Sequence, residues 1–485
     1  MENSKLIQLF KTFSQSEITE FGKFVNSPFH NESRKLINLY SYLKKFYLKF
    51  ADKKFSKEEA YISMYGSEKY NDKKLRDRFS DLLKLAEEYL AIASLRKLSC
   101  DEQILTLYEY KDRGLTTHFD KKYNELHQVL DRVKIKDIRL LYDSYVIESV
   151  KGDFSEYKNL LGKRKNSNFQ LEYEIENFVK FFVTRMLLYY ITMDNWAMQT
   201  NYKFDYKLYE PILNYVEEKK MYEPPILRAA YLMLKMEEDK NSEVFYFELK
   251  KLFKKEIKSF SIYDKTMVAV TLYNYAQKKY MEGNERFSLE RFEQIKLQLL
   301  YKTFSSLSGN IQREQYLNAI LISISLKKTD WAEKFAEEYK SQVKPEGRED
   351  TLAFARAALL HAKKKYGKAL EELASIKDID YVYYFKIKTL QARIYFEQQD
   401  FEKLLSLIDS FKHYITGNSL IPDENVARYK NFIGVLYSLT ILAIKKDEFK
   451  LSNLIRKINS FSYYEITTNK TWLLEKAYAL QKTGH

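Results

Sequence analysis

The chain has 485 residues, of which only 12 are glycine and 6 are proline. Typical usage would give roughly 34 glycines and 24 prolines at this length. Because these two residues end helices and form tight turns, the deficit predicts helix after helix with short polar connections. The hydrophobic content of 45%, with 41 tyrosines and 32 phenylalanines, excludes a disordered chain.

The formal net charge of +14 comes from 81 basic and 67 acidic residues, and most of the basic residues are lysine. The excess is spread thinly along the chain, with a mild bias towards the first hundred residues. Proteins that bind phosphate often favour arginine for its bidentate fork. A chain rich in lysine, isoleucine, asparagine and tyrosine fits an AT-rich genome equally well, so the charge is compatible with both a functional and a compositional origin.

A single cysteine, Cys100, rules out an intramolecular disulfide and fits a reducing compartment. The N-terminus leads into an amphipathic stretch rather than an apolar signal core. The longest uncharged apolar stretch, residues 431–444, is shorter than the roughly 20 residues that span a bilayer. We therefore expect a cytoplasmic protein without a membrane span.

The first hundred residues predict five helices. Ser14 and Glu17 form a capping-box pattern at the start of one of them. The last and longest carries apolar residues at steps of three and four from Leu75 to Ala93, which is the pattern of an amphipathic helix. We expect these helices to form an N-terminal helical domain.

From residue 101 onwards, helical patterns alternate with short charged turns. No stretch alternates at period two for long enough to predict a sheet. Residues 381–385 have the local character of a strand, but we expect them to join a helix that continues to Phe396. Pro211 and Pro225 occupy positions typical of a first helical turn.

The most regular feature is a charged or polar residue followed by an aromatic residue that begins a helix. Asp330-Trp331, Lys365-Tyr366 and Asp400-Phe401 are 35 residues apart, and Glu448-Phe449 follows at a longer step. A period near 34 residues is typical of stacked helical hairpins. Less regular examples are Asp153-Phe154, Asn195-Trp196 and Arg286-Phe287.

Residues 315–416 resemble the tetratricopeptide repeat (TPR) family, which places small residues where paired helices approach. Ala357, Ala369 and Ala392 match the small positions, Tyr366 and Phe401 match the aromatic position, and Tyr395 matches the family tyrosine. Ile322, Lys334 and Leu404 depart from the pattern. The resemblance implies an all-α, right-handed α-solenoid of stacked helical hairpins. We expect an N-terminal helical domain at 1–100, an irregular hairpin array at 101–314 and TPR-like repeats at 315–485.

The first hundred residues are also similar to uncharacterised helical proteins of Bacteroidetes-type bacteria. The similarity rests on Phe-Gly-Lys-Phe-Val-Asn-Ser-Pro-Phe at 21–29 and on Asp-Lys-Lys-Leu-Arg at 72–76. This similarity implies no activity for the chain.

No motif in the chain predicts an enzyme, a metal site or a cofactor. None of the six histidines lies four residues from another, and a single cysteine cannot build a zinc cage. The basic glycine segment at 161–165 lacks the first glycine and the strand of a phosphate-binding loop, so we interpret it as a solvated turn.

The TPR resemblance implies a non-enzymatic scaffold or adaptor that binds a peptide or a partner protein on the concave face of its repeats. The concave face combines aromatic and basic residues, which favours an acidic or amphipathic peptide as the partner. The family's carboxylate-clamp pattern is largely missing, although Lys386 matches one clamp position. The concave positions transfer to Tyr316, Ser323, Lys327, Phe354, His361, Lys386, Arg393 and Phe396.

The alternative is a nucleic-acid-binding transcriptional regulator with a helical-repeat sensor region. Residues 56–83 read as helix, turn, helix and resemble part of the winged-helix domain of bacterial regulators. Lys73, Lys74, Arg76 and Arg78 occupy early positions of the second helix, from which such helices contact bases and phosphates. No strands precede the segment and three aspartates interrupt the basic face, so a solvated helix face is the competing interpretation.

Overall fold

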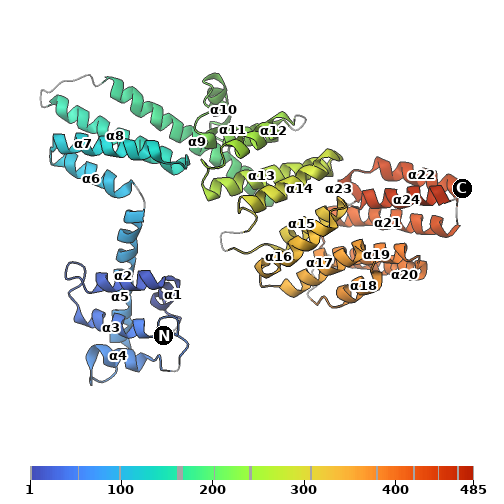
Figure 1. Cartoon of the computed structure of the whole chain (residues 1–485), viewed down its shortest axis with the longest axis horizontal. Coiled ribbons are helices and arrows are strands. Elements are labelled where there is room, and N and C mark those ends of the chain that lie inside the picture. The colour runs from blue at the N-terminus through green and yellow to red at the C-terminus, as the bar shows by residue number, and fades with distance from the viewer. Residues whose placement is uncertain are drawn as a thin grey trace. The chain divides into compact units, whose positions relative to one another are not determined.

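The computed structural model describes residues 3–52, 54–97, 100–160, 168–200, 202–239, 243–305, 309–377, 381–418, 421–445, 447–466 and 469–483. This part of the chain is all-α, and its β pairing is limited to an isolated bridge between Ile311 and Val343. The helices pack pairwise as in a repeat solenoid (Figure 1), which confirms the predicted fold class. The segment at 161–167 lies outside the described residues.

The chain divides into two compact units. The first comprises Met1–Val133 with Tyr142–Phe178, and the second comprises Lys134–Leu141 with Val179–His485. The predicted division at residues 100 and 314 stays a prediction. No helix in the described part of the chain combines the length and the apolar character that a bilayer span requires.

The five helices predicted in the first hundred residues are present, and three more complete most of the first unit. Together with the long helix that continues into the second unit, they are α1 (Lys5–Thr12), α2 (Gln15–Val25), α3 (Arg34–Lys45), α4 (Lys57–Tyr65), α5 (Asp72–Lys97), α6 (Asp101–Asp112), α7 (Thr116–Arg132), α8 (Ile138–Leu160) and α9 (Asn168–Thr200).

Helices α1 to α5 enclose an aromatic core. The rings of Phe21 and Tyr40 meet edge to face with centroids 5.5 Å apart. Gly22 lies against Tyr40, whose hydroxyl donates to the carbonyl oxygen of Ile18 at 2.6 Å. The capping box predicted at Ser14 is present, because its side chain accepts from the backbone N–H of Glu17 at 3.2 Å and Glu17 accepts in return at 2.8 Å.

The second unit contains the remaining helices: α10 (Tyr209–Glu218), α11 (Pro225–Glu238), α12 (Val244–Lys255), α13 (Ile262–Met281), α14 (Arg286–Leu300), α15 (Arg313–Ser325), α16 (Thr329–Tyr339), the short η1 (Lys340–Gln342), α17 (Arg348–Ala362), α18 (Tyr366–Ala374), α19 (Tyr381–Glu397), α20 (Phe401–Gly417), α21 (Asp423–Lys445), α22 (Glu448–Ser460), α23 (Tyr463–Ile466) and α24 (Lys470–Thr483).

The charged–aromatic pairs mark most of the predicted helix starts. Trp331, Tyr366, Phe401 and Phe449 lie in the first turns of α16, α18, α20 and α22, and α14 begins at Arg286. The pairs Asp153-Phe154 and Asn195-Trp196 lie inside α8 and α9 instead, so this part of the prediction is wrong. Gly152 directly precedes the first pair but lies inside α8, and no proline lies close before either pair to end the helix around it.

The hairpins of the second unit stack in chain order. α13 pairs with α14, α15 with α16, α17 with α18, α19 with α20 and α21 with α22, while the first helices α15, α17 and α19 contact one another along the stack. The array also curves back on itself, because α23 contacts α13. Figure 1 shows α23 beside α14 and α15, at the inner side of the array.

Candidate functional site

The second unit contains a cavity of about 320 Å³ on the inner side of the array. Its walls come from the first helices of four successive hairpins, α15, α17, α19 and α21. α13 and α14 contribute from one end of the array, and Asn469 contributes from the segment between α23 and α24. The contact of α23 with α13 therefore brings segments that are far apart in the sequence to one partly open cavity.

Four of the eight residues predicted to face a partner line this cavity. They are Phe354 and His361 from α17 and Lys386 and Arg393 from α19. The repeat register places them on facing helices, and the structure brings all four together. Whether they bind a partner stays a prediction.

The other four predicted residues lie elsewhere. The Tyr316 hydroxyl is buried in its hairpin and donates to the carbonyl oxygen of Ala336 at 2.7 Å. Ser323 is fully buried, and its hydroxyl donates to the carbonyl oxygen one turn earlier in α15. Phe396 packs edge-on against Trp472, and Lys327 is exposed in the turn after α15.

Three basic side chains line the cavity, namely Arg291, Lys386 and Arg393. Its described lining residues include no aspartate or glutamate. Each cation lies near an aromatic ring, and the guanidinium of Arg291 lies 3.6 Å from the ring centroid of Tyr280. Such contacts help to fix the position of a basic side chain. The described lining therefore contains more basic than acidic side chains.

Arg393 and His361 are two strongly desolvated ionisable groups of the lining. Burial lowers the pKa of Arg393, although the carboxylates of Glu397 and Glu475 act in the opposite direction. Burial, followed by the nearby charge of Arg393, lowers the pKa of His361 to about 4. His361 is therefore a neutral imidazole at neutral pH, because its proton is lost well below that pH.

Three buried polar atoms without a hydrogen bond belong to lining residues of α17 and α19. His361 Nε2, Thr389 Oγ1 and Arg393 Nε are buried and make no hydrogen bond with the described part of the protein. Buried polar atoms are nearly always paired in folded proteins, so a cluster of this kind is expected where a ligand or water binds.

Sequence reasoning missed several lining residues. Arg291 lies on the second helix of its hairpin, where the TPR resemblance assigns no concave position. Tyr429 lies on α21, beyond the residues to which the TPR resemblance assigned concave positions, and Asn469 reaches the cavity through the contact of α23 with α13. A local repeat pattern carries no signal for such a long-range contact.

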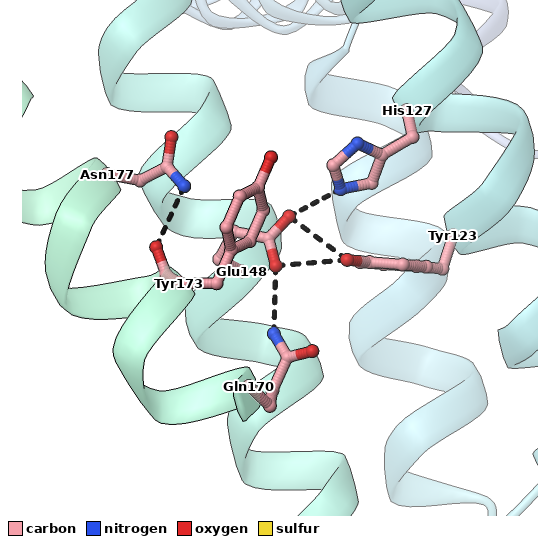
Figure 2. A network of polar contacts seen from close by, with 6 residues as sticks. All are labelled: Tyr123, His127, Glu148, Gln170, Tyr173 and Asn177. Carbon is pink, nitrogen blue, oxygen red and sulfur yellow. Dashed lines mark hydrogen bonds and ion pairs between the residues drawn. The ribbon is translucent and has the colours of Figure 1, made fainter. Parts of the chain in front are cut away.

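A second polar cluster lies in the first unit, between α7, α8 and α9 (Figure 2). The carboxylate of Glu148 is buried and accepts from the Tyr123 hydroxyl at 3.0 and 3.1 Å. It also accepts from Gln170 Nε2 at 2.8 Å and pairs closely with His127 Nε2. Figure 2 shows these side chains converging on the carboxylate from both neighbouring helices.

The charge of Glu148 determines the protonation of its neighbours. Its hydrogen bond raises the pKa of His127, against the opposing effect of burial. Burial, together with the same carboxylate, raises the pKa of Tyr123. Because the carboxylate is buried and its contacts join three helices, we interpret the cluster as a structural feature that holds α7, α8 and α9 together.

The basic residues of the nucleic-acid alternative lie on α5, and most of them form ion pairs within the first unit. Lys74, Arg76 and Arg78 have carboxylate oxygens of Glu68, Asp72 and Asp81 at 3.3, 3.0 and 3.0 Å. Lys73 is exposed. α4 and α5 have the predicted helix–turn–helix order, and the described residues around them form no wing strand.

The described residues contain no group of three or more histidine, cysteine, aspartate and glutamate side chains arranged to hold a metal ion. Cys100 is buried at the start of α6, as expected for an inert thiol.

Comparison with known proteins identifies the class of the array. Residues 251–404 match the family model described as the ARM repeat of tetratricopeptide repeat protein 21. This range runs from the end of α12 to the start of α20 and includes most of the cavity walls. No curated protein and no solved structure matches the chain.

The second unit therefore contains an ARM/TPR-like helical repeat region. Repeats of this class are typical of protein–protein interaction scaffolds, because stacked hairpins present extended surfaces to a partner.

Proposed function

We propose that the protein is a non-enzymatic scaffold or adaptor that captures an acidic segment of a partner protein. The segment binds at the inner side of the array, at the mouth of the cavity. The observation that carries the proposal is the composition of the lining, which includes three basic side chains and, among the described residues, no aspartate or glutamate. An acidic or amphipathic partner complements such a surface.

The absence of catalysis is part of the proposal. It is supported by the class of the repeat region, whose members are generally scaffolds, and by the lowered pKa of His361. A general base for reactions near neutral pH needs a pKa near that pH, and His361 lies well below it. A cytoplasmic location remains the expectation from the cysteine content.

The test is affinity capture from native lysate by the tagged full-length protein, with nuclease present, for the wild type and two variants. The double variant Lys386→Glu and Arg393→Glu reverses two charges of the lining. The control Lys388→Glu reverses a charge on the same helix, at a residue that does not line the cavity.

We expect the double variant to lose partners that the wild type and the control retain in stoichiometric amounts. Equal capture by all three proteins would show that the partner binds elsewhere. Circular dichroism of each variant separates loss of binding from loss of fold.

The nucleic-acid alternative has no comparable observation in its favour, because carboxylates pair with three of its four basic residues. It predicts binding with a steep salt dependence from counterion release. No shift of duplex DNA or RNA at low salt would remove it.

A further inference from the structure

The cavity is lined by helices that are not neighbours in a simple repeat groove. α23 contacts α13, so residues from the two ends of the array line the same space, with Gln277 from α13 and Asn469 from the segment before α24. A volume of about 320 Å³ is at the lower end of the range of small-molecule pockets, about 300–1,000 Å³. The space suits a compact ligand better than a length of polypeptide.

The cationic groups are held in position before any ligand binds. Arg291 donates through Nη1 to Gln277 Oε1 at 2.9 Å and stacks on Tyr280, and both partners also line the cavity. Arg393 lies 5.3 Å from the Trp472 ring. Preorganised donors bind an anion without a further ordering cost, and a guanidinium matches the paired oxygens of carboxylate or phosphate groups.

One face of α19 combines charge with neutral hydrogen-bonding groups. Lys386, Thr389 and Arg393 follow at steps of three and four, so they lie on the same side of the helix. Thr389 Oγ1 and Arg393 Nε make no hydrogen bond within the described protein, and neither does His361 Nε2 on the facing helix.

The geometry points to a binding site for a compact anion that carries carboxylate or phosphate oxygens, with Arg393 as its anchor. This inference goes beyond the proposed function, because the ligand is a free small molecule rather than a segment of a partner. The two ligands compete for the same cations, so a bound anion lowers partner capture.

The test is isothermal titration of the full-length protein with citrate and with pyrophosphate, which present clustered carboxylate and phosphate oxygens. We expect saturable one-site binding of at least one probe. Arg393→Gln weakens that binding by about tenfold or more, because it removes a charge-assisted, bidentate contact. Lys388→Gln, a matched change on α19 at a residue that does not line the cavity, leaves it unchanged.

A second measurement places the anion in the cavity. A bound anion near His361 raises the pKa of its imidazole, which is seen by NMR titration with His361→Gln to assign the signal. If Arg393→Gln does not fold, Lys386→Gln takes its place.

Three results would overturn the inference: no saturable binding of either probe, equal binding by the wild type and Arg393→Gln, or binding of a hexaglutamate peptide alone. The last result would support the proposed function while removing the small-molecule site. Anion binding without partner capture would retain this site and remove the proposed function.

Discussion

Gly22 of α2 lies against the side chain of Tyr40 on α3. A methyl group added at Gly22 would overlap the buried ring of Tyr40. We predict that Gly22→Ala destabilises the first unit by about 1–3 kcal/mol, because an overpacked core must shift. Urea denaturation followed by circular dichroism measures the change.

The same substitution elsewhere provides the control. Gly434 is an exposed position of α21 with open space around it. Gly434→Ala should stabilise the second unit by about 0.5–1 kcal/mol through the higher helix propensity of alanine. Equal effects at the two positions would show that Tyr40 does not constrain Gly22.

The His127–Glu148 pair gives the first unit a pH-dependent stability. Because the folded state raises the pKa of His127, its contribution is complete below the unfolded pKa of about 6.5 and is lost as pH rises through the folded value. We predict that His127→Phe costs about 1–2 kcal/mol near pH 5.5 and less near pH 8.5.

Urea denaturation at both pH values tests this dependence. Tyr123→Phe removes the hydroxyl that donates to both oxygens of the same carboxylate but leaves the histidine, so it should retain the pH slope. A slope that survives in His127→Phe would assign the titration to another group.

At the scale of single residues, the TPR resemblance pointed to four residues of the cavity lining. Phe354, His361, Lys386 and Arg393 were transferred from the family's concave positions, and the structure places all four in one cavity. Tyr316, on a neighbouring first helix, lies in the hairpin core because its hydroxyl finds a backbone carbonyl there. Side-chain direction within a register depends on such partners, which the pattern does not specify.

At the scale of the helical elements, the scarcity of glycine has a structural counterpart. The turns after α15, α17 and α19 place Lys327, Lys364 and Gln399 at φ 58°, in the left-handed region that glycine usually occupies. Such a conformation costs an ordinary residue roughly 1–2 kcal/mol. The array therefore has tight helix ends without the glycines that normally mark them.

We predict that Lys364→Gly stabilises the second unit by about 0.5–1 kcal/mol, because relief of the backbone strain exceeds the entropy that glycine loses on folding. Tryptophan fluorescence during urea denaturation measures it. Lys368→Gly, inside α18, should instead cost about 1 kcal/mol. Destabilisation in both variants would contradict the strain argument.

The sequence predicted the presence of helices more reliably than the positions at which they begin and end. Leu75 to Ala93 predicted α5 correctly, because apolar residues at steps of three and four over several turns line up on one face only in a helix. Asp153-Phe154 did not begin a helix, because a charged–aromatic pair marks a start only where the preceding helix has already ended. Before α16, α18 and α20, the preceding helix is ended by a residue in the left-handed conformation, namely Lys327, Lys364 and Gln399 in turn.

At the scale of the whole molecule, the two units have separate cores. Residues between Leu6 and Tyr89 enclose one hydrophobic cluster, whereas the clusters between Val183 and Ala477 belong to the second unit. All three tryptophans, Trp196, Trp331 and Trp472, lie in the second unit.

We predict that urea unfolding followed by tryptophan fluorescence and by far-ultraviolet circular dichroism gives different midpoints, because only the latter reports both units. Gly22→Ala should shift the dichroism curve and leave the fluorescence curve in place. Coincident curves in both proteins would mean that the units unfold together.

The stacking of hairpins was predictable because each contact joins neighbours in the sequence. The contact of α23 with α13 was not, because it depends on the curvature accumulated over all the intervening hairpins. Asn469 enters the cavity only through this contact, so the residues around it in the chain carry no signal that places it there.

That contact also changes how the array should unravel. In a linear solenoid each repeat holds only its neighbours, so the last hairpin can fray while the rest stays folded. Here the C-terminal end is attached to a helix about two hundred residues upstream, so fraying at that end must first open the loop. Amide hydrogen exchange from α21 to α24 would then proceed as one event shared with α13, rather than helix by helix from the terminus.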